Sequence, residues 1–138
     1  RKDIGFDRNI KNSVIDYKTG GDSRSVKSFE DLFDREQKKK TKAIFQVFLY
    51  AWLLESSELS DKDLNLGIIL SKELFSSDFS RDIKVNYKSI SYFDYSDEFK
   101  VGLSELINEL FNRNIPFATT TNEKHCIYCD YKFLCDKQ

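Results

Sequence analysis

The chain has 138 residues, of which 40% are hydrophobic and 33% charged, and its formal net charge is -1. This composition is typical of one soluble globular domain. No apolar run reaches the roughly 18 residues of a membrane span. We expect no signal peptide, because the sequence opens with Arg-Lys-Asp and has no apolar h-region. A net charge near zero gives no general argument for nucleic-acid binding, so any such surface has to be a local basic patch.

All three cysteines lie after residue 125. An odd number of cysteines gathered at one end does not make a disulfide framework, so we expect a reducing cytoplasm. The sequence also opens abruptly, with strand-like residues at 1–8. We therefore expect a domain whose natural N-terminal part is missing.

The segment 13–20 is predicted to be a buried strand, because Val14 and Ile15 are β-branched and apolar and a pair of glycines ends it. Asp16 and Lys18 are two residues apart, so they project from the same face of this strand near its end. Two charged groups at the end of a buried strand are costly unless they bind something.

A second carboxylate, Asp7, precedes this strand. Residues 9–12 have the composition of a turn, so a hairpin there would bring Asp7 close to Asp16. Two carboxylates and the amine of Lys18 in one place are what a hard divalent cation and a phosphodiester require.

The remaining elements alternate between helix and strand. We first expect a short helix over 29–33 capped by Ser28, and then a long helix that follows the basic run 36–42 and ends near Ser56. A buried parallel strand over 64–70 and a half-exposed or edge strand over 82–92 should follow. The last elements are an amphipathic helix, capped by Ser96 and stopped by Asn114 and Pro116, and an irregular tail over 117–138. The long helix is apolar on nearly every face and should be buried. Its exceptions, Gln46 and Tyr50, continue a stripe that begins at Lys42.

In this order the motifs resemble those of the PD-(D/E)XK nucleases of the RecB/AddB type, over almost the whole chain. The resemblance rests on Gly5-Phe6-Asp7-Arg8, on Asp16-Tyr17-Lys18-Thr19-Gly20, on Gln46-Val47-Phe48-Leu49-Tyr50, and on Cys126-Ile127-Tyr128-Cys129 followed by Cys135. It implies a single domain over 1–138 with an α/β, restriction-endonuclease-like fold, in which helices flank a central mixed β-sheet.

Two parts of the family pattern have no counterpart in this sequence. One is an acidic or histidine motif on an upstream helix, and the other is a fourth, upstream cysteine of an iron–sulfur cluster. Both would lie before Arg1, which fits truncation; the alternative is a copy that has lost its activity or its cluster.

The resemblance implies a Mg²⁺ (or Mn²⁺) site held by Asp7, Asp16 and the backbone carbonyl of Tyr17. The metal would polarise the scissile phosphate and lower the pKa of a bound water. Lys18 would orient that water or neutralise charge on the phosphoryl oxygens.

Gln46 is expected to hydrogen-bond Lys18 or the water, and Tyr50 to hold a DNA phosphate or pack beside the site. Arg8 and Lys42 are candidate phosphate contacts. Taken singly, each has an ordinary structural interpretation: Gln46 as a satisfied core amide, Tyr50 as a core aromatic, Lys42 as part of a solvated helix start, and the carboxylate–lysine pair as a surface ion pair.

The cysteines leave three interpretations open: a [4Fe–4S] cluster with Cys126, Cys129 and Cys135 as three of its ligands, a zinc site completed by His125, or free thiols. We expect cluster ligands in the intact protein and no complete cluster in this piece.

The leading hypothesis is a Mg²⁺-dependent DNA nuclease, an exonuclease that hydrolyses phosphodiester bonds within a helicase–nuclease for double-strand break repair and recombination. Its expected partners are DNA and a helicase domain or subunit, with no membrane. The alternatives are a non-catalytic DNA-binding or scaffolding module that retains the nuclease fold, and a CRISPR-associated RecB-like nuclease.

Overall fold

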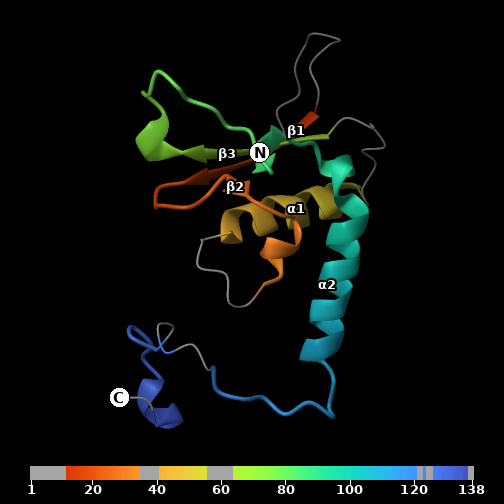
Figure 1. The fold of residues 1–138 in the computed structure, drawn as a ribbon, viewed down its shortest axis with the longest axis vertical. Helices are drawn as coiled ribbons and strands as arrows, with labels where there is room; N and C mark the ends of the chain where they lie inside the picture. The colour runs from red at the N-terminus through yellow and green to blue at the C-terminus, as the bar shows by residue number, and fades with distance from the viewer. Residues whose placement is uncertain (1–11, 35–40, 56–63, 121–122, 124–125, 137–138) are drawn as a thin grey trace. The chain divides into compact units, whose positions relative to one another are not determined.

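The computed structural model describes residues 12–34, 41–55, 64–120, 123 and 126–136. The chain divides into two compact units, Arg1–Ser104 and Glu105–Gln138. In the first unit, two strands and the helix between them form a βαβ arrangement (Figure 1).

Strands β1 (Asn12–Lys18) and β3 (Leu64–Leu70) pair in parallel, in register from Asn12 opposite Leu64 to Lys18 opposite Leu70. β3 is a short apolar run, and β1 has Val14 and Ile15 at its centre, as expected for strands that are buried on a face. Parallel strands need a long crossover connection, and helix α1 (Lys42–Glu55) lies within it. The predicted parallel pairing and the predicted end of the long helix are confirmed.

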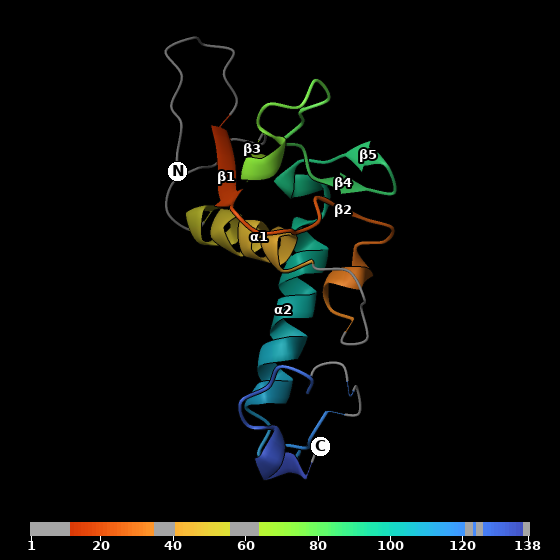
Figure 2. The same ribbon diagram turned by 90° about the vertical axis from the view of Figure 1, so that its left-hand side faces the viewer.

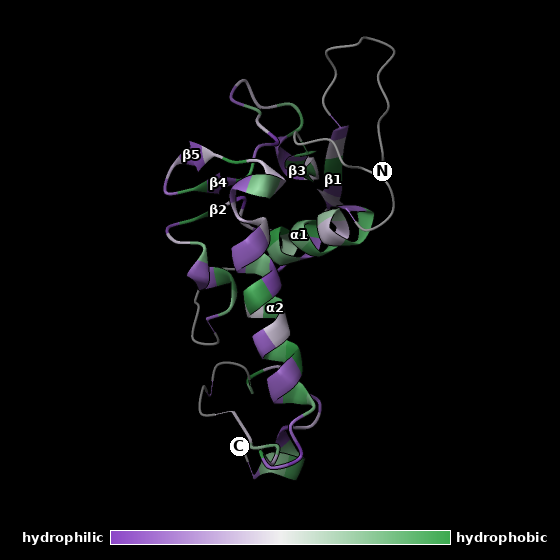
Figure 3. Cartoon of the chain, turned by 90° about the vertical axis from the view of Figure 1, so that its right-hand side faces the viewer, coloured by the Kyte–Doolittle hydropathy of each residue, from purple (hydrophilic) through white to green (hydrophobic). Residues whose placement is uncertain are grey.

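Helix α1 packs on the β1–β3 sheet and supplies much of the core. Its fully buried positions recur at helical spacing and comprise Ala43, Ile44, Val47, Phe48 and Ala51. Figure 3 shows the helix coloured mainly as hydrophobic. The burial of this helix was predicted because apolar residues cover nearly every face of it.

A second, small sheet has the order β2-β4-β5 and contains β2 (Ser25–Val26), β4 (Lys84–Val85) and β5 (Lys88–Ser89). The β2–β4 pair is parallel and the β4–β5 pair is antiparallel. Isolated bridges from Asn65 to Ser91 and from Gly67 to Asp82 join β3 to the ends of the β4–β5 segment. The described strands thus give a mixed α/β fold, which confirms the coarse fold class.

The prediction of one half-exposed strand over 82–92 is wrong, because the segment folds back on itself as a hairpin. Asn86 and Tyr87 form its turn with positive φ angles of 47° and 65°. Tyr87, which the alternation placed beside Val85 on the apolar side, is 86% exposed. The local preference of asparagine for left-handed turns outweighs the alternating pattern here.

Single turns of 3-10 helix connect the larger elements: η1 (Glu30–Leu32), η2 (Ser71–Glu73), η3 (Tyr92–Asp94) and η5 (Lys132–Cys135). The predicted cap at Ser28 is wrong. Phe29 is the N-cap of η1 and makes no side-chain cap, while the Asp31 carboxylate accepts a hydrogen bond from the Ser28 N–H at 3.3 Å. Ser91 and Asp94 form a capping box at η3.

Helix α2 (Ser96–Leu110) begins in the first unit and ends in the second. Phe99 and Leu103 are buried, as the apolar stripe predicted. The rest of that stripe, expected to face the core, is exposed: Leu106, Ile107, Leu110 and Phe111. The periodicity of the sequence thus predicted which face of α2 is apolar, but not how far along the helix that face is buried.

The second unit contributes no residue to the hydrophobic core cluster of the described chain. Among the described residues, no helix combines the length and apolarity that crossing a bilayer would take.

Candidate active site

The side chains of Asp16 and Lys18 lie together near the carboxyl end of β1. Alternate residues of a strand share a face, which places both charges on the side that faces α1. Lys18 Nζ lies 3.0 Å from Asp16 Oδ2 and donates a hydrogen bond of 2.6 Å to Gln46 Oε1 on α1. The lysine therefore joins the strand carboxylate to the helix amide.

The Asp16 Oδ2 atom is buried and receives no hydrogen bond. Lys18 Nζ lies 3.0 Å from this oxygen, so the ammonium balances its charge as an ion pair. The two side chains are only partly buried, with Asp16 19% and Lys18 26% exposed. A carboxylate that is partly exposed as a group and lies beside an ammonium has the hard oxygen donors that a divalent cation prefers.

The described part of the site supplies one carboxylate. Asp7 and Arg8 lie outside the described residues, and no group of three or more His, Cys, Asp or Glu side chains within the described ranges is placed to hold a metal. The second predicted carboxylate ligand remains a prediction.

The other predicted residues of this site lie on the opposite face of β1 or one helical turn away from Gln46. Tyr17 occupies the alternate face of β1 and is 57% exposed, so only its backbone carbonyl is a candidate ligand. Lys42 and Tyr50 flank Gln46 by one helical turn on each side, and both are exposed. Within the described chain neither has a hydrogen bond or ion pair.

The three cysteines belong to the second unit and are free thiols, each partly buried. The Cys129 N–H donates to the Cys126 carbonyl at 3.2 Å, which closes a turn between these two residues, and Cys135 ends η5. As described, the three do not gather into a group able to hold a metal. The [4Fe–4S] assignment stays a prediction.

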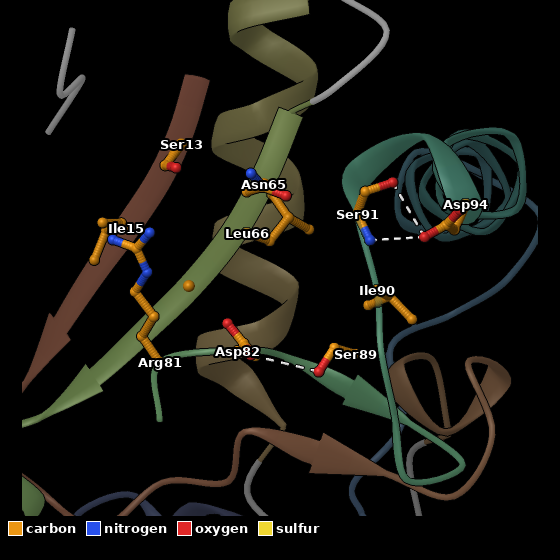
Figure 4. Close-up of a pocket in the computed structure, with 11 residues that line it drawn as sticks. Ser13, Ile15, Asn65, Leu66, Arg81, Asp82, Ser89, Ile90, Ser91 and Asp94 are labelled. Carbon is orange, nitrogen blue, oxygen red and sulfur yellow. Dashed lines mark hydrogen bonds between the residues drawn. The ribbon is translucent and has the colours of Figure 1, made fainter. Parts of the chain in front are cut away.

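A separate cavity of about 450 Å³ lies on the face of the β1–β3 sheet that points away from α1 (Figure 4). Its lining includes Ser13 and Ile15, the residues that alternate with Asp16 on β1, so the sheet separates it from the lysine. Arg81 lies across Gly67, where an added Cβ would stand 3.4 Å from the Arg81 carbonyl oxygen. The sequence interpretation did not single out this face, on which β1 and β3 contribute one polar residue each, Ser13 and Asn65.

A βαβ unit that brings a carboxylate, a lysine and a glutamine together at one strand end has the donors and charges of a phosphodiester-cleaving site. The profile of the PD-(D/E)XK nuclease superfamily matches residues 4–136. The chain belongs to this superfamily, which indicates a nuclease, and therefore a hydrolase, of a kind that generally uses divalent metals such as Mg²⁺. No curated protein and no solved structure matches the chain.

Proposed function

We propose that this chain is a Mg²⁺-dependent deoxyribonuclease domain that hydrolyses phosphodiester bonds at the end of β1. The observation that carries the proposal is the position of the Lys18 ammonium between Asp16 and Gln46, next to a carboxylate oxygen without a hydrogen bond. Superfamily membership supports the reaction class.

Asp16 would hold the cation through its carboxylate, with Asp7 as its expected second carboxylate. When bound, the cation would polarise the scissile phosphate and lower the pKa of a water molecule. Lys18 would direct one of its N–H groups at the attacking water or at a phosphoryl oxygen, because an ammonium has three donors and Gln46 takes one. Gln46 thereby fixes the direction of the remaining donors.

DNA would approach along the exposed stripe of α1. Lys42 carries an exposed ammonium that has no ion pair with the described residues and suits a phosphate. The Tyr50 side chain lies one turn beyond Gln46 on the same stripe. Arg8 is the expected phosphate contact from the upstream segment.

The order of the four motifs supports a finer assignment to the RecB/AddB type. On that basis we propose an exonuclease that works with a helicase domain or subunit in double-strand break repair, in the cytoplasm, with the three cysteines binding a [4Fe–4S] cluster in the intact protein.

Lys18→Ala tests the proposal directly. We expect it to abolish Mg²⁺-dependent cleavage of a labelled DNA while leaving the circular dichroism spectrum unchanged. Asp16→Asn should do the same and should also remove the rise in melting temperature that Mg²⁺ causes in the wild type. The matched control is Lys72→Ala, which removes an exposed lysine of η2 that has no ion pair in the described chain.

Cleavage retained by Lys18→Ala would rule out the proposed role of the lysine. Wild-type DNA binding without any cleavage or metal response would favour the non-catalytic module instead.

A further inference from the structure

The turn of the β4–β5 hairpin presents a tyrosine in a backbone conformation that tyrosine disfavours. Asn86 and Tyr87 both have left-handed φ angles, of 47° and 65°. Two-residue hairpin turns of this hand favour Asn-Gly, because glycine alone adopts the second position without strain. Asn86 follows that preference and Tyr87 does not.

The ring of Tyr87 contributes nothing to the core that could account for this choice. The residue is 86% exposed, and no aromatic pair or hydrogen bond involves it in the described chain. Figure 2 shows the hairpin at an edge of the first unit, with its turn on the side away from β1.

Backbone hydrogen bonds fix the hairpin to the neighbouring segment 24–26. The Asn86 N–H donates to the Val26 carbonyl at 3.0 Å, and the Lys84 N–H donates to the Arg24 carbonyl at 2.9 Å. The ring is therefore carried on a fixed support rather than on a loose loop, which lowers the entropy lost when a ligand contacts it.

Three lysines belong to the segments that border this turn: Lys27 follows β2, and Lys84 and Lys88 lie on β4 and β5. Lys27 and Lys88 are exposed and Lys84 is half-buried, and none of them has a carboxylate partner within the described ranges. The nearest acid on the hairpin, Asp82, accepts a hydrogen bond from Ser89 at 3.4 Å and lines the cavity. A chain with a net charge of -1 thus carries three lysines, without a carboxylate partner in the described chain, on the segments next to one exposed tyrosine.

We propose that the β4–β5 turn is a contact for single-stranded DNA, in which Tyr87 stacks on an unpaired base and the three lysines contact the backbone phosphates. An exposed aromatic ring among cations is the combination that single-strand binding uses, since every base offers a flat face and every nucleotide a phosphate. The inference rests on the proposed nuclease function and adds the nature of the substrate strand.

The turn lies within reach of the same DNA strand as the candidate active site. Lys18 and Ser25 are separated by seven residues, so their Cα atoms are at most about 25 Å apart, and the Asn86 N–H bonds directly to the neighbouring Val26. A strand of about seven nucleotides spans that distance at 3.4 Å per nucleotide.

Tyr87→Gly separates the DNA contact from folding, because glycine suits the turn better than tyrosine. We expect its melting temperature to be unchanged or up to about 4 °C higher. Its affinity for a fluorescent single-stranded oligodeoxythymidine of about twelve nucleotides, measured by anisotropy in EDTA, should fall by about 5- to 150-fold. Tyr87→Asn, which also tolerates the turn, should lose affinity similarly, and Tyr87→Phe should keep it.

Two further variants distinguish stacking from general charge. Lys88→Gln should lower the slope of log affinity against log salt by about 0.7, the value for one phosphate contact on a single strand. Phe75→Ala removes a ring that is 99% exposed in the same unit but lies outside this lysine group, and it should bind like the wild type.

Two negative results of these binding experiments would have different meanings. If the wild type binds no DNA, the nuclease proposal and this inference both fall. If the wild type binds but Tyr87→Gly and Tyr87→Asn bind equally well, the nuclease proposal stands, this inference is wrong, and the exposed ring belongs to a protein contact.

Discussion

The contacts of its ammonium group, more than the burial of its side chain, hold Lys18 in place. Its ammonium is shared between a carboxylate and an amide, while a quarter of the side chain remains exposed. Partly exposed ion pairs of this kind contribute about 0–1 kcal/mol to stability. The pair therefore contributes little to holding the fold together, and substitutions in it should report on chemistry rather than on unfolding.

Gln46→Leu removes the amide acceptor and keeps a side chain of similar size. We expect kcat for Mg²⁺-dependent cleavage to fall by about 10- to 100-fold, because the ammonium loses the group that fixes its direction. KM should change less than twofold, since Gln46 has no proposed phosphate contact. Steady-state kinetics on a labelled oligonucleotide would measure both constants.

Gln46→Glu is the matched comparison, because it keeps an oxygen acceptor for Lys18. It should retain more activity than Gln46→Leu. If both variants match the wild type in kcat, the hydrogen bond from Lys18 to Gln46 has no positioning role.

At the scale of elements, Glu55 joins the end of α1 to α2 and η3. It accepts hydrogen bonds from the Tyr92 hydroxyl at 2.8 Å and from Lys100 Nζ at 3.0 Å. Burial works to raise the pKa of Glu55, but the hydrogen bonds from Lys100 and Tyr92 and the charge of Lys100 outweigh it and leave the pKa below its ordinary 4.5. Burial and the Glu55 contact raise the pKa of Tyr92.

Glu55→Gln should destabilise the protein at neutral pH by about 1 kcal/mol, because the charged partner of Lys100 is lost. A depressed folded-state pKa adds stability above pH 4.5 that is lost as the pH falls through the lower folded-state value. The difference in unfolding free energy between wild type and variant should therefore shrink on acidification below pH 4.5. Urea unfolding at several pH values would measure it.

Tyr92→Phe is the control, since it keeps the fully buried ring and removes only the hydroxyl. Wild-type stability should also fall above pH 10, where the unfolded tyrosine ionises and the folded one does not, and this loss should be weaker in Tyr92→Phe. A difference between wild type and Glu55→Gln that stays constant down to pH 2 would contradict the assignment.

Gly102 allows α2 to pack closely on Phe33. A Cβ at this position would stand 2.6 Å from the Phe33 ring, which is itself held against Phe45 and Phe99 with ring centroids 5.9 and 6.0 Å apart. Alanine normally favours a helix over glycine by about 1 kcal/mol. Here we expect Gly102→Ala to destabilise by about 1 kcal/mol instead, because the Phe33 ring would have to leave its contacts with Phe45 and Phe99 to admit the methyl group.

The same substitution in a Phe33→Leu background provides the comparison. With the ring gone, Gly102→Ala should become neutral or stabilising by up to about 1 kcal/mol, as thermal denaturation would show. Stabilisation by Gly102→Ala in the wild-type background would mean that the ring yields easily.

The elements that could be predicted are those whose pattern has one physical solution. The β-branched pair Val14 and Ile15 in β1, the apolar run of β3 and the apolar α1 between them favour a parallel βαβ unit. The spacing of two then puts Asp16 and Lys18 on one face. The direction of the Lys18 ammonium toward Gln46 followed from the resemblance and not from periodicity.

The predictions that were wrong concern segments whose pattern allows more than one structure. Alternation over 82–92 suits a strand as well as a hairpin, and only the turn preference of Asn86 separates them. In α2, a continuous apolar stripe is buried as far as Leu103 and exposed from Leu106 onward, because burial depends on what packs against the helix and the helix sequence does not contain that information. The cavity beside Arg81 also depends on contacts between distant segments.

For the whole molecule, the distribution of buried side chains predicts a sharp contrast in local stability. All residues of the hydrophobic core cluster lie between Val14 and Leu103, and the second unit contributes none. Its described backbone hydrogen bonds after α2 are short-range turns, such as that from the Cys129 N–H to the Cys126 carbonyl. Regions with few buried contacts open locally at little cost in free energy.

Hydrogen–deuterium exchange of the intact chain should therefore show the slowest amides in β1, β3 and the buried turns of α1. Those amides open only with global unfolding, which for a domain costs about 5–15 kcal/mol. Amides of 111–120 and 126–136 should exchange within the shortest labelling time, and a fully deuterated sample provides the reference. Protection of the cysteine segment equal to that of β3 would contradict this, because it would require buried contacts around the three thiols that the described fold does not contain.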